Sequence, residues 1–322
     1  MGVQDITEKS LEGLPDVFAD IVNVLLFNGR QVINPNTLSD STVRSIYKAE
    51  GQIFEQERDV AKSWKNEVDI SIALIGFENQ TRIESNMPIR VISYDGANYR
   101  YQIRRIDEAR KAHHESPKLY PVITLVLYFG MRKWVASPNL IDHLDIPNEL
   151  KPFVSDYKMN LFQIAYLDDE TIDKFQSDFR TVARFFADRR KLRDGEISEL
   201  TETTQELMHA KEVFEMLGSI SGDHRFESAY NEVVHAGKEQ TMCSVLNEIQ
   251  EKGRAEGRVE GRAEGRAEGR AEGRSEGHTE GWSDAKNYYI EALIQNLMSE
   301  NPSLSKDSAK KRAMQLLGIP EK

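Results

Sequence analysis

Residues 72–81, with the sequence IALIGFENQT, limit the possible folds of this chain more than any other stretch. Six uncharged residues, most of them apolar, are followed directly by Glu78, Asn79, Gln80 and Thr81. An apolar run of this kind indicates a strand buried on both faces, which is typical of the middle of an α/β sheet. The question is why a core strand ends in a carboxylate, two amides and a hydroxyl.

The segments around this strand alternate between helical and strand patterns. Apolar residues at helical spacing predict a helix over 15–27, and a short polar connection between two β-rich runs favours an antiparallel pair. The expected elements are helix 15–27, strands 55–64 and 69–78, helix 87–115 with Gly96 as its one breaker, strands 121–130 and 159–167, and helix 178–194. This order, α-β-β-α-β-β-α, predicts an α/β fold with a central sheet flanked by helices.

The composition changes after about residue 195. Residues 197–218 and 224–253 read as helices with few β-branched residues, and the tail reads as a helical hairpin broken at Asn301-Pro302. Because 322 residues are too many for one small core, one large domain with extensions is expected. The predicted division is a core domain over 1–195, a helical accessory region over 196–252, a repeat over 253–281 and a helical tail over 282–322.

The repeat has glycine at every fourth position from Gly253 to Gly281, with arginine and glutamate on the same period. Glycine at this density costs an isolated helix roughly 1 kcal/mol per residue, which favours a flexible linker. A four-residue period also places a glycine stripe on one slowly drifting helix face, where a second helix could approach closely. We prefer the helix, associated with its copy in another chain, and keep the flexible linker as the alternative.

Several classes of protein are excluded by composition. The longest apolar run, 122–129, is far shorter than the ~20 residues of a membrane-spanning helix, and the first residues lack a secretory pattern, so we expect a cytoplasmic protein without membrane association. The single cysteine, Cys243, excludes an internal disulfide and a thiolate zinc cluster. A net charge of −11 means that binding to nucleic acid must depend on a local basic patch or on metal ions.

The polar end of the 69–78 strand suggests a metal site. Alternate residues of a strand share a face, so Glu78 and Gln80 point to one side and Asn79 points away. Mg²⁺ prefers carboxylate oxygens, and a second carboxylate would complete a minimal site. Asp69 lies nine residues earlier in the same predicted strand, roughly 30 Å away at about 3.3 Å per residue. Asp59, in the preceding antiparallel strand, can instead come next to Glu78.

We therefore expect Asp59 and Glu78 to share one cation, with Gln80 holding a water or a phosphate oxygen. The alternative interpretation is that residues 78–81 merely end the strand and begin a loop.

Several segments in this order resemble the Rpn family of recombination-promoting nucleases, transposase-like proteins of the PD-(D/E)XK superfamily. They are FADIVNVLLFNGRQVINPNTL, RDVAKSW, IALIGFENQT, MPIRVISYDGANYRYQI and PVITLVLYFGMRKW. The resemblance covers about residues 15–195. It implies a restriction-endonuclease-like PD-(D/E)XK core of order α-β-β-β-α-β, followed here by a helical C-terminal extension, and Mg²⁺-dependent cleavage of DNA phosphodiesters, with Mn²⁺ as a possible substitute.

The resemblance also assigns residues. Asp59 matches the aspartate of the motif, Glu78 its second acidic residue and Gln80 its final lysine, while Asp20 loosely matches an acidic residue of the first helix. Glutamine in place of lysine removes a fixed positive charge, although a metal ion can by itself polarise the phosphoryl oxygen and generate hydroxide.

Basic residues on the predicted helix 87–115 are candidates for contacts with DNA phosphates, although a solvated helix face explains them equally well. They are Arg90, Arg100, Arg104 and Arg105. The main hypothesis is thus a metal-dependent DNA endonuclease that forms a homo-oligomer through its repeat. The rival is a catalytically inactive nuclease fold that serves as a binding or scaffolding module.

Overall fold

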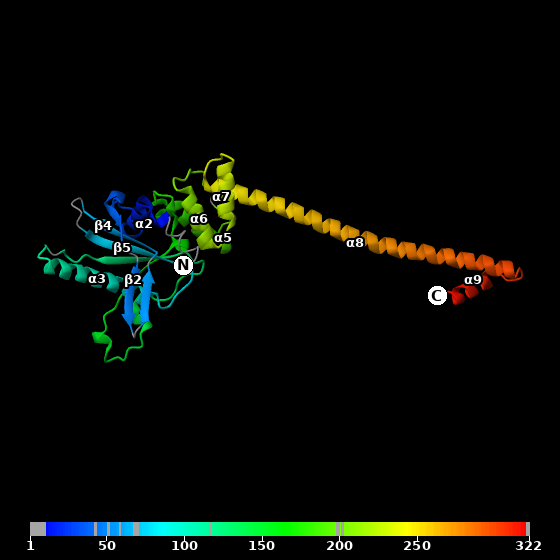
Figure 1. The fold of residues 1–322 in the computed structure, drawn as a ribbon, viewed down its shortest axis with the longest axis horizontal. Helices are drawn as coiled ribbons and strands as arrows, with labels where there is room; N and C mark the ends of the chain where they lie inside the picture. Colours follow the sequence, from blue (N-terminus) through cyan, green and yellow to red (C-terminus); the bar gives the residue numbers. More distant parts are fainter. Residues whose placement is uncertain are drawn as a thin grey trace. The chain divides into compact units, whose positions relative to one another are not determined.

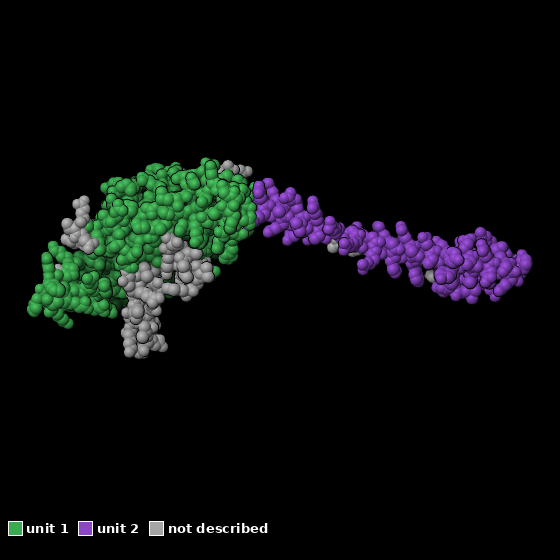
Figure 2. Space-filling view, turned by 45° about the horizontal axis from the view of Figure 1, so that its top comes forward, with its two compact units in different colours: residues 1–250 green, residues 251–322 purple. Residues whose placement is uncertain are grey.

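The structure is a computed structural model, and its ribbon is shown in Figure 1. It describes residues 11–41, 44–49, 52–57, 59–66, 71–115, 117–197, 200 and 203–319. The chain divides into two compact units, residues 1–250 and residues 251–322, which Figure 2 shows in different colours. Across the described helices, none is both long and apolar enough to cross a membrane.

The first unit contains a five-stranded mixed sheet with the order β1-β4-β5-β6-β7. Its strands are β1 (Leu38–Asp40), β4 (Val60–Lys65), β5 (Ser71–Gln80), β6 (Val122–Tyr128) and β7 (Asn160–Gln163). β4 is antiparallel to both β1 and β5, whereas β5, β6 and β7 are parallel to one another. The central strand β5 therefore joins the antiparallel half of the sheet to its parallel half.

Helices cover both faces of this sheet (Figure 1). Helix α2 (Pro15–Phe27) packs on one face, where the rings of Phe18 and Phe77 stack with their centroids 4.3 Å apart. Helix α3 (Met87–Lys111) covers the other face, where Met87 and Val91 are buried with Val126 of β6. Burial on both faces explains why β5 reads as an almost continuous apolar run.

The remaining helices of the first unit extend the core on the α2 side. They are α4 (Asp169–Asp173), α5 (Phe179–Arg193), α6 (Ala210–Ser221) and α7 (Arg225–His235), and short 3₁₀ turns lie at Pro35–Thr37, Leu140–His143, Lys151–Phe153 and Ile164–Tyr166. Phe185 of α5 meets Phe226 of α7, and Phe214 of α6 stacks on the same ring. Leu207, Phe214, Val233 and Val245, from the region that we expected as accessory, belong to the same core as the sheet, and the two compact units divide after Gln250.

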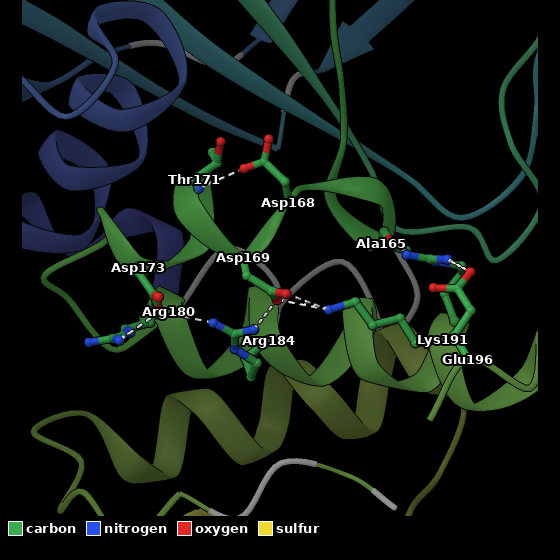
Figure 3. A network of polar contacts seen from close by, with 10 residues as sticks. Ala165, Asp168, Asp169, Thr171, Asp173, Arg180, Arg184, Lys191 and Glu196 are labelled. Carbon is green, nitrogen blue, oxygen red and sulfur yellow. Dashed lines mark hydrogen bonds and ion pairs between the residues drawn. The ribbon is translucent and has the colours of Figure 1, made fainter. Parts of the chain in front are cut away.

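A network of ion pairs joins α4 to α5 (Figure 3). Asp169 accepts from Arg184 and, at 2.8 Å, from the Lys191 ammonium. Asp173 accepts from Arg180 at 2.8 Å and from Arg184 at 2.9 Å. Since these groups are partly exposed, each pair contributes little stability, and the network mainly fixes the orientation of the short helix α4.

The strand predictions need three corrections. The predicted strand 55–64 is two strands, because β3 (Gln52–Glu57) pairs with β2 (Arg44–Ala49) in a separate two-stranded sheet, and only β4 joins the main sheet. β1 and β2 were not predicted. The predicted strand 159–167 ends at Gln163 and continues as a 3₁₀ turn. Asp69, at the start of the other predicted strand, lies outside the described residues.

The helix predictions are closer to the structure. α3 passes through Gly96 without a break, and the helix predicted from residue 197 begins only at Ala210. The helix predicted over 224–253 is interrupted around Gly237, whose φ of 63° lies in the left-handed region that favours glycine. Residues 253–281 are helical, as part of α8 (Met242–Glu300), which agrees with the helical interpretation of the repeat.

The tail forms the expected helical hairpin. α8 ends at Glu300, and α9 (Lys306–Leu316) begins after the Asn301-Pro302 break with Ser305 as its N-cap. Ala309 and Ala313 of α9 are buried against Ile294 of α8. Small residues on α9 let the two helices approach closely, so the hairpin has a small core of its own.

Candidate functional site

The candidate site lies at the carboxyl end of β5. Its parallel neighbour β6 ends at the same edge, with Gln80 opposite Tyr128, and six residues separate the end of β5 from the start of α3. In sheets with parallel strands, ligands bind beyond the carboxyl ends of the strands. The three polar residues that end β5 therefore occupy the edge where a substrate would be expected.

Glu78 and Gln80 lie on the face of β5 that α3 covers. Glu78 is buried, and its Oε1 accepts a hydrogen bond of 3.3 Å from the Gln80 amide. Asn79 points to the opposite face, where its side-chain amide donates to the Glu12 carboxylate at 2.8 Å. This alternation follows from the geometry of a strand.

Asp59 stands opposite Glu78 across the antiparallel pair. Val60 is the register partner of Phe77, so the next residue pair outward along the two chains is Asp59 with Glu78. Oδ2 of Asp59 accepts the backbone N–H of Asn79 at 2.7 Å, which holds Asp59 against the end of β5. Directly opposite residues in an antiparallel pair place their side chains on the same face. If the register of β4 and β5 continues for one more residue pair, both carboxylates lie on the face covered by α3.

Arg90, in the first turn of α3, is the basic residue of the site. Its Nη2 donates to Glu78 Oε1 and, at 3.1 Å, to the Tyr94 hydroxyl, while its Nη1 donates to Glu84 Oε2 at 2.7 Å. Burial is the largest single influence and works against the charged guanidinium, but Glu78, Tyr94 and Glu84 together outweigh it and raise the pKa of Arg90 above its ordinary value. Arg90 therefore carries its charge at all relevant pH values.

Tyr94 lies one helical turn after Arg90, and the charges of both carboxylates affect the pKa of its phenol. Burial raises the pKa of its phenol, and the negative charges of Glu78 and, more weakly, Asp59 raise it further, against the opposing effect of Arg90. The phenol thus stays protonated at neutral pH. Because the charges of both acidic residues act on one hydroxyl, this shift supports the arrangement that the strand register gives.

The donor set fits a magnesium ion. Mg²⁺ is usually held by one or two carboxylates and keeps several waters for contacts with substrate phosphates. Asp59 and Glu78 supply two carboxylates from neighbouring strands, and Gln80 supplies an amide oxygen on the same side. Within the described ranges, no group of three or more His, Cys, Asp or Glu residues is placed to hold a metal ion.

Comparison with known proteins identifies this part of the chain. Residues 73–216 match the family model described as "Putative transposase, YhgA-like". This stretch, 144 of the 322 residues, is similar to that family. The resemblance to the transposase-like Rpn proteins is thereby confirmed. Neither the curated proteins nor the solved structures contain a match to the chain.

The YhgA-like match runs from β5 to α6 and contains Glu78, Gln80, Arg90 and Tyr94. It begins after Asp59, so the assignment of Asp59 depends on the strand register and on the motif alone.

Two predicted groups of residues lie apart from this cluster. The carboxylate of Asp20 accepts the backbone N–H groups of Gln176 and Ser177 at 2.9 and 2.7 Å, so it ties α2 to the turn before α5. Arg104 and Arg105 are exposed on α3. Arg104 is 14 residues beyond Arg90, which places it about 21 Å further along the helix axis at 1.5 Å per residue.

Sequence reasoning missed three residues at the end of β5, namely Tyr94 and Glu84, which contact Arg90, and Glu12, which contacts Asn79 on the opposite face. Tyr94 could have been predicted in part, because Arg90 and Tyr94 are four residues apart on a predicted helix and so share a face. Glu84 lies in the turn between β5 and α3, and Glu12 precedes α2. Their positions depend on how these segments fold against the sheet, which local patterns do not reveal.

Proposed function

We propose that the protein is a metal-dependent DNA endonuclease whose site consists of Asp59, Glu78 and Gln80. The observation that supports the proposal is the hydrogen bond from the Asn79 N–H to Asp59 Oδ2, which holds the Asp59 carboxylate beside the residue that follows Glu78, at the carboxyl end of the strand that joins the two halves of the sheet. The YhgA-like family supports it, because the family name indicates proteins that act on DNA.

The order of elements also supports the proposal. Apart from the hairpin β2–β3, the chain runs α2, β1, β4, β5, α3, β6. This order is similar to the α-β-β-β-α-β order that the resemblance to the PD-(D/E)XK nucleases implies. Asp59 directly precedes β4, and Glu78 lies on β5.

The residues would act as follows. Asp59 and Glu78 would hold Mg²⁺ or Mn²⁺, which when bound polarises a phosphoryl oxygen and lowers the pKa of a coordinated water. The Asn79 N–H fixes the orientation of Asp59, and Gln80 can accept from or donate to the attacking water. Gln80 has no charge, and a fixed positive charge in direct contact with Glu78 comes from Arg90.

The direct test is cleavage of supercoiled plasmid by the full chain. The proposal predicts conversion to nicked or linear DNA with Mg²⁺ or Mn²⁺ and none with excess chelator. Absence of any cleavage with either metal, in protein whose fold is verified by circular dichroism, would favour the rival function as a binding module.

The repeat of α8 supports a second proposal, that it joins two copies of the chain. Successive helical residues turn by about 100°, so glycine, arginine, alanine and glutamate each form a stripe along residues 253–281. Like charges four residues apart repel within one helix. The described side chains of the repeat are exposed, and a Cβ added at any of its glycines would meet open space. A second helix can therefore approach the glycine stripe and place opposite charges beside each charged stripe.

The order of the stripes around the helix favours a parallel pair of helices over an antiparallel pair. The glycine stripe has arginine on one flank and glutamate on the other. When two such helices face each other in parallel, the arginine flank of one lies across from the glutamate flank of the other, whereas an antiparallel pair would bring like flanks together. Each cross-chain pair adds only about 0.2–1 kcal/mol and is screened by salt, so the association should weaken as ionic strength rises.

Light scattering of the full chain and of a variant lacking residues 253–281 tests the association, since the deletion should lower the oligomeric state. Orientation is tested by disulfide trapping in a Cys243→Ser background. Gly257→Cys should oxidise to a covalent dimer if the helices are parallel and in register. Crosslinking only in a mixture of Gly257→Cys and Gly277→Cys chains would show an antiparallel pair.

A further inference from the structure

Arg90 is held against the candidate metal ligand Glu78 by an unusually complete set of partners. Its guanidinium donates to the Glu78 carboxylate, to the Glu84 carboxylate at 2.7 Å and to the Tyr94 hydroxyl at 3.1 Å. The side chain of Glu78 is only 4% exposed, whereas that of Arg90 is 34% exposed. The arginine thus covers a buried carboxylate from the solvent side.

A buried carboxylate requires a compensating cation, because an uncompensated charge in the protein interior costs several kcal/mol. The described contacts of Glu78 supply one such cation, the Arg90 guanidinium. A divalent metal ion at the same carboxylate would supply the same compensation. Two cations held at one carboxylate repel each other, so the binding of one weakens the binding of the other.

We infer that Arg90 and the metal ion are alternative counterions of Glu78, so that Arg90 keeps the site closed until a divalent metal ion displaces it. Glu84 makes the exchange possible, since it lies at the second nitrogen of the guanidinium and can retain Arg90 after Glu78 is released. Glu84 is partly exposed, at 38%, and the displaced guanidinium would therefore face the solvent side, from which DNA must approach. This inference rests on the proposed function, because it assumes that Glu78 is a metal ligand.

The test is the affinity of the full chain for Mn²⁺ in the absence of DNA, measured by titration calorimetry. Arg90→Gln removes the competing charge and keeps a polar side chain. Its Mn²⁺ affinity should therefore exceed that of the wild type by about tenfold or more, because a charge interaction that shifts a pKa by one unit changes a binding constant about tenfold. Arg90→Lys keeps the charge but cannot bridge two carboxylates, so its affinity should lie between the two. Arg90→Lys also tests the inference if Arg90→Gln does not fold.

Arg110→Gln is the matched control, since it removes an exposed arginine from the same helix far from Glu78, and its affinity should equal that of the wild type. Glu78→Gln should bind Mn²⁺ much more weakly than the wild type.

Two other outcomes have distinct meanings. If Arg90→Gln binds Mn²⁺ no more tightly than the wild type while Glu78→Gln loses binding, the metal site stands and the counterion exchange is wrong. If neither the wild type nor Arg90→Gln binds Mn²⁺, the metal site itself is wrong, and the proposed function falls with this inference.

Discussion

Gln80 is the residue at which the site departs most clearly from the nuclease motif. It stands where the motif has lysine, and its amide lies 3.3 Å from Glu78 Oε1. A lysine there would place an ammonium beside Glu78 on the side away from the backbone of β5. The structure shows that the site already contains a cation, Arg90, which comes from the following helix and not from the strand.

The first prediction concerns this position. Gln80→Lys should preserve or raise the rate of plasmid cleavage at saturating Mg²⁺, because it adds a positive charge that stabilises the negative transition state. Gln80→Met, of similar size but unable to form hydrogen bonds, should lower the rate. Equal rates in all three proteins, measured on the same supercoiled plasmid, would mean that Gln80 takes no part in the reaction.

Substitution of Gly130 and of Gly96 by alanine should change the stability of the fold in opposite directions. A Cβ on Gly130 would overlap the phenol ring of Tyr128, which is buried, so Gly130→Ala should destabilise the fold by about 1–3 kcal/mol. Gly96 lies inside α3 with open space around it, and Gly96→Ala should stabilise the helix by about 1 kcal/mol. Urea unfolding of both variants measures this difference, and a stabilised Gly130→Ala protein would contradict the packing described for β6.

Elements were predictable where one physical signal dominated. β5 and β6 are buried on both faces and α2 has a clear apolar stripe, so their apolar patterns identified them. The hairpin β2–β3 was missed because its residues, RSIYKA and QIFEQE, mix charged and apolar residues without a long apolar run. We predicted one strand over 55–64 because the sequence between the end of β3 at Glu57 and the start of β4 at Val60 contains no glycine or proline.

The candidate site was predictable to the extent that it depends on strand geometry. Alternation along β5 predicted that Glu78 and Gln80 share a face, and the antiparallel connection predicted that Asp59 could meet them. The role of Arg90 as the partner of Glu78 was not predictable, because it depends on where the first turn of α3 docks on the sheet. Asp20 was misjudged for a similar reason, since its partners come from a turn more than 150 residues later in the chain.

The repeat helix gives a prediction at the scale of the element. In Gly265→Ala/Gly269→Ala, each alanine has a higher helix propensity, so circular dichroism should show equal or greater helicity. The added methyl groups would at the same time hold a second helix away from the glycine stripe, so light scattering should show weaker association. Ala263→Ser/Val259→Ala, away from the glycine stripe, is the control. Greater helicity with unchanged association would mean that the glycines do not form the contact.

At the scale of the whole molecule, the chain contains two compact units for which we propose different functions. The first unit carries the sheet, the acidic pair and the basic first turn of α3, while the second carries the repeat and a small helical hairpin. If the repeat pairs in parallel, two copies of the first unit are tethered at the same end of the paired helices. A pair of nuclease sites linked in this way could act on both strands of a duplex, whereas a single site cuts one strand at a time.

The role of Asp59 and Glu78 as metal ligands is tested by the rate of Mg²⁺-dependent plasmid cleavage by Asp59→Ala and Glu78→Ala. The wild type is the reference. Glu170→Ala, which removes an exposed glutamate from α4, is the control. The account predicts that each site variant loses at least about a hundredfold in rate, because it loses a direct metal ligand, while Glu170→Ala cleaves normally and all four proteins show the same circular dichroism. Chelator-sensitive cleavage at the wild-type rate in either site variant would show that the metal ion binds elsewhere and would contradict the account.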